Sequence, residues 1–399
     1  MLRVPKFKHP ERVIWGLPPS KSHMIRWIAL AAQSKSKVEL CFNGIPGEDI
    51  NSMANCMEKL GVEIQREPGK WTIGGKLKGH SSPKKTLECG NSATTARIVT
   101  SMAARFGGAI EIDGDGSLRR RDASALNSAL RSLGCKIPSD EMPFSVSGPI
   151  VGGNAIIDQS ISSQTLTGLL LASPSFPAGT CVSLEGEAVS RGYLELTIEI
   201  CRSCGWGGDI SGDSVDLGPW EVETPEIVNI PEEISLLPLS KLFDALHGTT
   251  SMDAQIGNKD PRIMKAIGQT MICEGGVVNL RDASDIIAPA ASLIAIRGGG
   301  SISGCSHARG KESDRIGSTI RMLSSFGILS EETEDGLLIP GGQWPSTPSE
   351  PVDSEGDHRL SMTAVVLASA VGGEVSGHNV CSSTHPEFIA MMMGEMEGL

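Results

Sequence analysis

One order of sequence elements recurs along the 399-residue chain, and this repetition constrains the fold more than any other feature. In each copy, an apolar helical segment is followed by a turn of small residues, a β-like run, a polar link and an amphipathic helix that ends at glycine. A glycine there is typical of a helix C-cap. Six copies, most of them about 70 residues apart, predict duplication of one α/β unit. The alternative is an ordinary α/β protein whose helices and strands alternate by coincidence. The apolar segments begin at Ile28, Ile98, Leu169, Leu239, Ser292 and Ala364.

The length of the chain favours two domains, because a single hydrophobic core seldom grows so large. Three copies per domain is the natural grouping. Residues 223–232 carry two prolines and several acidic side chains, as a linker between domains does.

Charge and composition exclude some classes of function. The net charge of −12 argues against general binding of nucleic acid or anionic membranes. The start of the chain lacks the apolar core of a signal peptide, and the stretch 363–371 is too short to span a bilayer, so we expect a cytoplasmic protein. Its 10 cysteines would stay reduced there. Cys201 and Cys204 form a lone pair that we interpret as helix positions rather than a metal or redox site.

Basic residues recur at predicted helix starts, which suggests a divided site for anions. In Pro18-Pro-Ser-Lys-Ser-His-Met-Ile-Arg26, prolines and serines mark a helix start whose free N–H groups can bind phosphate or carboxylate. Lys21 adds a point charge and Arg26 a bidentate fork. A solvated, well-capped helix start explains this motif equally well.

Further motifs place polar residues at similar positions in the other copies. Gly90-Asn-Ser-Ala-Thr-Thr-Ala-Arg97 gives ligand atoms access to the backbone at a helix start, or serves close helix packing. Ser162-Ser-Gln164 alone would be an ordinary N-cap. The arginines of Gly114–Arg121 and the charges of Lys311–Arg315 would also suit exposed faces, and Asp357-His-Arg359 precedes the last apolar helix. Their joint placement suggests a polyanion site between two domains.

In their order along nearly the whole chain, these motifs resemble those of the 5-enolpyruvylshikimate-3-phosphate (EPSP) synthase family of enolpyruvyl transferases. The resemblance implies a two-domain inverse α/β barrel-like fold in which each domain holds three βαβαββ repeats. It places residues 21–231 in one domain and residues 1–20 with 232–399 in the other, with the active site in the cleft between them. It implies transfer of the enolpyruvyl group of phosphoenolpyruvate to the 5-hydroxyl of shikimate 3-phosphate by a monomer that needs no metal or organic cofactor.

The resemblance also assigns residues to each substrate. Asp285 would accept the proton of the attacking hydroxyl, and Glu312 would shuttle a proton at the methylene carbon, with Lys21 as a further catalytic group. Shikimate 3-phosphate would be bound by Lys21, Ser22, Arg26, Ser162, Ser163, Gln164, Ser190, Tyr193, Asp285, His307 and Lys311. Phosphoenolpyruvate would be bound by Lys21, Asn91, Ala93, Arg121, Gln164, Arg315 and Arg359. Because each substrate carries a carboxylate and a phosphate, so many cations make physical sense.

Three positions depart from the family pattern. Asp122 follows Arg121 where the family usually has proline. Ala93 replaces a glycine beside the phosphoenolpyruvate subsite, and the added methyl group predicts weak inhibition by glyphosate. Ser383 stands where the family has a lysine near the C-terminus, and we hypothesise that His385 supplies part of the missing positive charge.

Three other functions stay open at this point. The sister transferase that acts on UDP-N-acetylglucosamine shares the fold, but its usual cysteine is missing from the loop of residues 114–121. Ser383 would also suit a drifted paralogue with a cyclitol or aminoshikimate acceptor. It would equally suit a non-catalytic anion-binding protein, although such a protein would not need Asp285 and Glu312.

Overall fold

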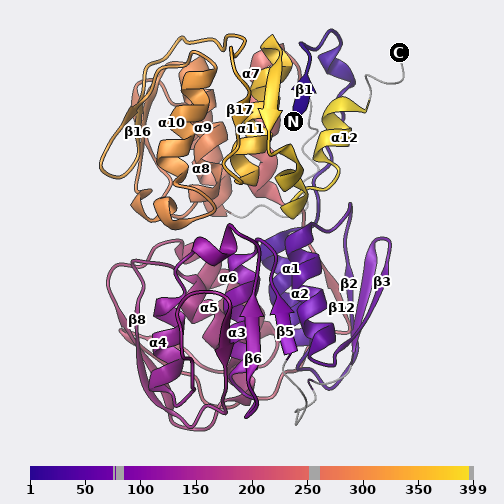
Figure 1. The fold of residues 1–399 in the computed structure, drawn as a ribbon, viewed down its shortest axis with the longest axis vertical. Helices are drawn as coiled ribbons and strands as arrows, with labels where there is room; N and C mark the ends of the chain where they lie inside the picture. The colour runs from indigo at the N-terminus through magenta and orange to yellow at the C-terminus, as the bar shows by residue number, and fades with distance from the viewer. Residues whose placement is uncertain (75–76, 78–84, 251–260, 395–399) are drawn as a thin grey trace. The chain divides into compact units, whose positions relative to one another are not determined.

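The computed structural model describes the chain except for residues 75–76, 78–84, 251–260 and 395–399 (Figure 1). The chain divides into two compact units, one formed by residues 19–231 and the other by residues 1–18 with 232–399. The expected boundaries, by comparison, lay between residues 20 and 21 and between residues 231 and 232. No helix in the described ranges is long and apolar enough to cross a membrane.

The unit of residues 19–231 contains three small sheets in its described part, each with one parallel pair of strands. The first sheet has the order β12 (Ile227–Asn229), β2 (Val38–Cys41), β4 (Lys70–Gly74), β3 (Glu63–Glu67). The second has the order β5 (Lys85–Glu88), β6 (Ile110–Asp113), β7 (Phe144–Val146). The third has the order β10 (Ile210–Ser211), β11 (Ser214–Asp216), β9 (Thr180–Glu185), β8 (Gly153–Asp158).

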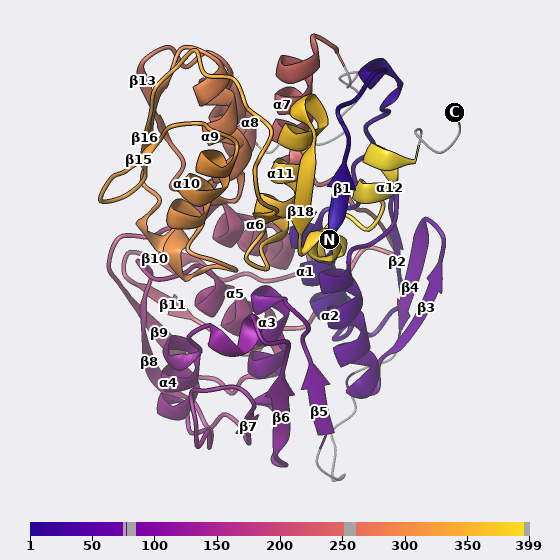
Figure 2. The ribbon, with the colours of Figure 1, turned by 45° about the horizontal axis from the view of Figure 1, so that its top comes forward.

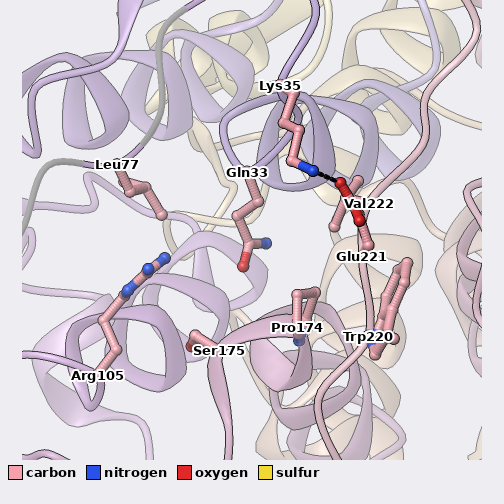
Figure 3. Close-up of a pocket in the computed structure, with 9 residues that line it drawn as sticks. All are labelled: Gln33, Lys35, Leu77, Arg105, Pro174, Ser175, Trp220, Glu221 and Val222. Carbon is pink, nitrogen blue, oxygen red and sulfur yellow. Dashed lines mark ion pairs between the residues drawn. The ribbon is translucent and has the colours of Figure 1, made fainter.

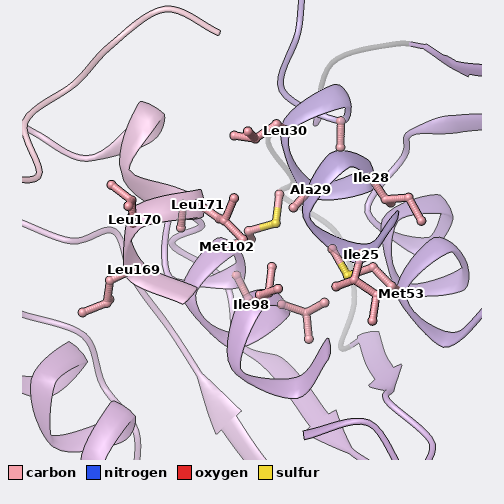
Figure 4. Packing of buried hydrophobic residues seen from close by; sticks show 14 of the residues in the cluster. Ile25, Ile28, Ala29, Leu30, Met53, Ile98, Met102, Leu169, Leu170 and Leu171 are labelled. Carbon is pink, nitrogen blue, oxygen red and sulfur yellow. The ribbon is translucent and has the colours of Figure 1, made fainter. Parts of the chain in front are cut away.

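Three helices whose residues are mostly buried form the centre of this unit: α1 (Lys21–Ala31), α3 (Ala93–Ala103) and α5 (Gln164–Ala172). Such burial is expected of a helix that other elements surround. Three other helices are amphipathic and bury only one face: α2 (Glu48–Lys59), α4 (Ser124–Ser132) and α6 (Arg191–Ser203). Ile28, Ile98 and Leu170 belong to one hydrophobic cluster that includes buried residues of all three helices (Figure 4). We expect truncation of Leu170 to alanine to cost about 2–5 kcal/mol.

Gly168 shows how closely two central helices approach each other. A Cβ atom at this position would lie 2.8 Å from the backbone oxygen of Arg97 in α3 and 2.9 Å from Ser101 Oγ. Only glycine therefore fits at this crossing of α3 and α5. The close packing fixes the relation between the first turns of both helices, which carry site residues.

The other unit has two sheets in its described part. One has the order β1 (Leu2–Val4), β18 (Gly373–Ser376), β17 (Val352–Asp353), and the other β13 (Gly276–Asn279), β14 (Gly300–Ser303), β16 (Leu337–Ile339), β15 (Glu331–Glu332). Since Leu2 pairs with Val375 in an antiparallel ladder, the start of the chain belongs to the same unit as its end (Figure 2). The helices are α7 (Leu237–His247), α8 (Pro261–Met271), α9 (Ile287–Ile296), α10 (Arg315–Ser325), α11 (His358–Val371) and α12 (Phe388–Met393).

The order helix, strand, helix, strand occurs in α1–β2–α2–β3, α3–β6–α4–β7, α5–β9–α6–β10 and α9–β14–α10–β15. The sixfold repeat itself stays a prediction, and part of its fourth copy lies outside the described residues. The helix placement predicted for the cysteine pair is confirmed, because Cys201 lies in α6 and Cys204 is the C-cap of that helix. Both thiols are buried, and burial raises the pKa of Cys204 to about 11.

Candidate active site

In the unit of residues 19–231, the expected site residues gather at the first turns of the three central helices. Ser20 caps α1 by accepting from the backbone N–H of His23, and Ser92 caps α3 by accepting from that of Thr95. Lys21, Ala93 and Gln164 are the first residues of their helices. Free N–H groups and the helix dipole make these positions favourable for anions.

Lys21 is held by a carboxylate that the sequence motifs did not reveal. Its Nζ lies 2.9 Å from Oδ2 of Asp49, whose side chain is 7% exposed. Asp49 is in the first turn of α2, 28 residues along the chain, so only the packing of α1 on α2 brings the two together. The pair fixes the direction of the lysine beside the first turn of α1.

Arg26 lies deeper than the sequence suggested. Only 2% of the residue is exposed, and its guanidinium donates to Thr197 Oγ1 at 2.8 Å, to the backbone oxygen of Ser22 at 2.7 Å and to that of Tyr193 at 3.0 Å. Burial lowers the pKa of Arg26 to about 10, so it remains charged at neutral pH. Arg26 thus braces α1 against α6 and fixes the backbone on which Ser22 and Tyr193 sit.

Arg121 and Asn91, two residues expected to bind phosphoenolpyruvate, are hydrogen-bonded to each other. Arg121 Nη2 donates to Asn91 Oδ1 at 2.7 Å, while Asn91 Nδ2 donates to Asp115 Oδ2 at 2.9 Å. Arg97, which sequence reasoning did not assign to the site, lies close by and donates to the backbone oxygen of Asp122 at 2.8 Å. Burial and the like charge of Arg121 lower the pKa of Arg97 to about 10. Helix α3, which carries Arg97, and the loop that carries Arg121 therefore hold two arginines close together.

The serines of the third helix start occupy capping positions. Ser162 Oγ accepts from the backbone N–H of Gln164 at 3.1 Å, and Ser163 immediately precedes α5. Gln164 Nε2 donates to Thr94 Oγ1 of α3 at 3.1 Å. Ser190, just before α6, has a left-handed backbone with φ of 51°, a strained conformation for a residue other than glycine. Such strain clusters at binding sites.

In the other unit, one buried arginine gathers three carboxylates. Arg315 opens α10 and donates through Nε to Asp357 at 2.8 Å, through Nη2 to Glu312 at 2.6 Å and through Nη1 to Asp285. Burial lowers the pKa of Arg315, but the three negative charges outweigh this effect and raise it well above its usual value. Lys311 Nζ lies 3.0 Å from the same Asp285 oxygen. The structure thus brings the two expected proton-transfer carboxylates, Asp285 and Glu312, onto one cation.

Asp357 is the residue of this cluster that was not singled out from sequence. It is fully buried, caps α11 by accepting from the backbone N–H of Arg359 at 2.8 Å and also accepts from Ser313 Oγ at 3.1 Å. Its place in the Asp357-His-Arg359 motif was the available signal. Asp357 couples the position of Arg315 to the first turn of α11.

Arg359 differs from Arg315 because it has no ion-pair partner among the described residues. It is 4% exposed, and its guanidinium donates to the backbone oxygen of Ser235 at 3.1 Å and to Ser235 Oγ at 2.8 Å. Its Nε is buried without a hydrogen-bond partner in the described part of the chain. A buried guanidinium without a counter-charge is costly, and an anionic ligand would relieve that cost.

The two histidines of this unit that were expected at the site, His307 and His385, are neutral at physiological pH. Burial lowers the pKa of His307 to about 4, with a further contribution from Lys311, and its Nε2 lies 3.1 Å from Ser284 Oγ. Burial likewise lowers the pKa of His385 to about 4, and its Nε2 lies 3.0 Å from the backbone oxygen of Gly16. This buried, neutral state argues against the hypothesis that His385 supplies part of the positive charge of the missing lysine. Ser383 is buried in a short 3-10 helix, His378–Ser383.

Comparisons with known proteins agree on one family. The sequence model described as EPSP synthase (3-phosphoshikimate 1-carboxyvinyltransferase) matches residues 13–230 and 240–392. A 3-phosphoshikimate 1-carboxyvinyltransferase of Methanocorpusculum labreanum is 30% identical, with 94% of each chain covered. One of Methanothermobacter thermautotrophicus is 29% identical, again with 94% of each chain covered. The structure is similar to that of EPSP synthase from Acinetobacter baumannii, with a TM-score of 0.72 and 21% identity over 99% of this chain and 96% of the other.

Proposed function

Since the chain belongs to the EPSP synthase family, we infer that it transfers the enolpyruvyl group of phosphoenolpyruvate to the 5-hydroxyl of shikimate 3-phosphate. The products are 5-enolpyruvylshikimate 3-phosphate and phosphate, in the biosynthesis of aromatic compounds. The resemblance drawn from the motifs is confirmed by the family match and by the fold.

The state of Arg359 is the observation that best supports an anionic substrate beside the proton-transfer carboxylates. Its buried guanidinium lacks a carboxylate partner among the described residues. Arg315 donates one hydrogen bond to each of three carboxylates, those of Asp357, Glu312 and Asp285. A guanidinium has five N–H groups, so two remain for a ligand. We propose that Arg315 and Arg359 bind the carboxylate of phosphoenolpyruvate by charge-assisted hydrogen bonds.

The remaining phosphoenolpyruvate contacts come from the unit of residues 19–231. Arg121, fixed by Asn91, would bind the phosphate, with Arg97 adding positive potential. The first turn of α3 would offer its N–H groups beside Ala93, and Lys21 and Gln164 would reach both substrates.

Shikimate 3-phosphate would be bound mainly at the starts of α1, α5 and α6. Serine hydroxyls and helix N-termini at Ser22, Ser162, Ser163 and Ser190 suit a phosphate. Tyr193 would pack against the ring, and His307 and Lys311 would contact the acceptor from the other unit. Arg26 acts in this proposal through the backbone of Ser22 and Tyr193, because its own guanidinium is buried in hydrogen bonds.

The chemistry needs one group that takes a proton and one that gives a proton. The acceptor hydroxyl forms a bond to C2 of phosphoenolpyruvate as Asp285 removes its proton, and C3 gains a proton from Glu312. In the second step C3 returns a proton, the bond from C2 to the phosphate oxygen breaks, and phosphate leaves. Arg315 touches both carboxylates and so balances their charge as protons move.

Phosphate release tests this function against its alternatives. With phosphoenolpyruvate present, we expect release only on addition of shikimate 3-phosphate. Release with UDP-N-acetylglucosamine would indicate the sister activity, release with an aminoshikimate or other cyclitol alone a drifted paralogue, and no release with any acceptor a binding protein. The cytoplasmic location, the monomeric state and the predicted cleft between the domains stay predictions.

A further inference from the structure

A polar pocket lies in the unit of residues 19–231, at the opposite ends of the central helices from Lys21, Ala93 and Gln164. It has a volume of about 200 Å³ and is lined by residues that follow α1, α3 and α5, among them Gln33, Arg105 and Pro174. Since α1 and α3 each have 11 residues, about 16 Å of helix separates it from their first turns. It is therefore distinct from the proposed transfer site.

The charges around this pocket leave one cation without a counter-charge. Lys35 and Glu221 form an ion pair with each other on one side (Figure 3). Arg105 lies on the other side, beyond Gln33, and has no ion pair or side-chain hydrogen bond among the described residues. Burial lowers the pKa of Arg105, with no neighbouring carboxylate that opposes the effect. Its guanidinium nevertheless stays charged at neutral pH, because arginine is not deprotonated in proteins.

Arg105 is not needed to cap the helices that end here. The backbone N–H of Ile150 donates to Ala104 at 3.1 Å and that of Leu77 donates to Ala32 at 3.2 Å. Gln33 Nε2 donates to the backbone oxygens of Ala29 and Leu171, at 3.0 and 2.8 Å. The carbonyl groups at the helix ends thus have other donors, and the N–H groups of Arg105 remain for a ligand.

The pocket also has an apolar wall. The pocket is lined by the indole of Trp220, the ring of Pro174 and the side chain of Leu77 (Figure 3). Trp220 Nε1 donates to Ser173 Oγ at 2.8 Å, which fixes the plane of the indole. The volume of the pocket is below the range of about 300–1,000 Å³ that is typical of sites for drug-sized molecules. A ligand with a single ring therefore suits the pocket better.

We propose that this pocket binds a small monocarboxylate with a flat apolar body, whose carboxylate pairs with Arg105 and whose ring packs between Trp220, Pro174 and Leu77. A guanidinium fork matches the two oxygens of a carboxylate. The Lys35–Glu221 pair offers no net charge to a second anionic group, so the pocket prefers one carboxylate to a dianion.

Benzoate is a suitable probe, with the indole N–H signals of the 15N-labelled full chain as the readout. The chain has 6 tryptophans, and a Trp220→Phe variant identifies the signal of Trp220. We expect benzoate to move this signal in a saturable way. Acetophenone, a neutral molecule of similar shape, should bind about tenfold more weakly or worse, because it cannot form the charged hydrogen bonds.

Two variants then distinguish a specific contact of benzoate with Arg105 from a general effect of positive charge on binding. Arg105→Gln should weaken benzoate binding by about tenfold or more. Arg202→Gln, which removes a cation of the same unit that pairs with Asp209, should bind benzoate as the unchanged chain does. The proposal is overturned if benzoate gives no saturable shift of Trp220, or if Arg105→Gln binds it equally well. Equal binding of acetophenone and benzoate to the unchanged chain would overturn it without any variant.

Discussion

Arg315 Nε donates to Asp357 Oδ2 at 2.8 Å, and the two side chains are 3% and 0% exposed. A buried ion pair of this kind is costly to break from one side, because the remaining charge is left without its partner. Asp357 also caps α11 through the backbone N–H of Arg359. One carboxylate therefore positions both arginines that we assign to phosphoenolpyruvate.

Replacement of Asp357 by asparagine should destabilise the fold and weaken substrate binding together. Asparagine keeps a capping oxygen but removes the charge opposite Arg315, and we expect a loss of about 3 kcal/mol in unfolding free energy and a higher KM for phosphoenolpyruvate. Urea unfolding and steady-state kinetics measure the two effects. Glu355→Gln is the matched control: it disrupts the more exposed Arg321–Glu355 pair and should cost no more than about 1 kcal/mol. Equal losses in both variants would contradict the role of Asp357.

The two neighbouring arginines at the end of the Gly114–Arg121 run should behave differently. Arg121 contacts Asn91, whereas Arg120 is exposed. Arg121→Gln should raise the KM for phosphoenolpyruvate by about 10- to 100-fold through the loss of charged hydrogen bonds. Arg120→Gln should leave it within about twofold, since surface charges contribute little. Similar KM values for the two variants would show that Arg121 does not bind phosphoenolpyruvate.

Asp285 and Glu312 should affect turnover more than binding. Asp285→Asn and Glu312→Gln keep the shape of each side chain but abolish its proton transfer, which is typically worth about 10²–10⁴ in rate. We expect kcat to fall by that amount, while the KM for shikimate 3-phosphate changes by only a few-fold. A variant that retains normal kcat would exclude that carboxylate from the chemistry.

His385 should make the protein less stable as the pH falls. Its pKa is about 4 in the folded chain and about 6.5 when unfolded, so the unfolded state binds more protons between these values. Stability is therefore complete above pH 6.5 and is lost as the pH falls towards 4, by about 2 kcal/mol between pH 7.5 and 5 for this one group. Urea unfolding of the unchanged chain and of His385→Gln should differ in pH dependence by that amount. From pH 6 to 9 the variant should leave the pH profile of kcat and KM unchanged.

Ala93 should control inhibition by glyphosate. It is the first residue of α3 and is buried, so its methyl group would narrow the phosphoenolpyruvate subsite. We expect Ala93→Gly to lower the inhibition constant by about tenfold, as relief of a small overpacking would. Potent inhibition of the unchanged enzyme, equal to that of Ala93→Gly, would refute this expectation.

Sequence patterns predicted the fold class because helix starts and glycine caps are local signals. Lys21, Ala93 and Gln164 do begin helices. The patterns could not reveal Asp49 beside Lys21, or Ser235 beside Arg359, because these pairs join segments 28 and 124 residues apart. The burial of His385 against Gly16 could not be predicted for the same reason, since these residues lie far apart in the sequence.

Exchange of the methylene hydrogens of phosphoenolpyruvate with solvent is the most direct test of the proposed transfer. If the acceptor adds to C2 while C3 gains a proton, C3 is briefly a methyl group and can lose any of its hydrogens. In D2O with shikimate 3-phosphate, we predict 5-enolpyruvylshikimate 3-phosphate with deuterium in its enolpyruvyl methylene group, detected by NMR and mass spectrometry. Phosphate released without this product, or a product that carries no deuterium at the methylene carbon, would contradict enolpyruvyl transfer by this chain.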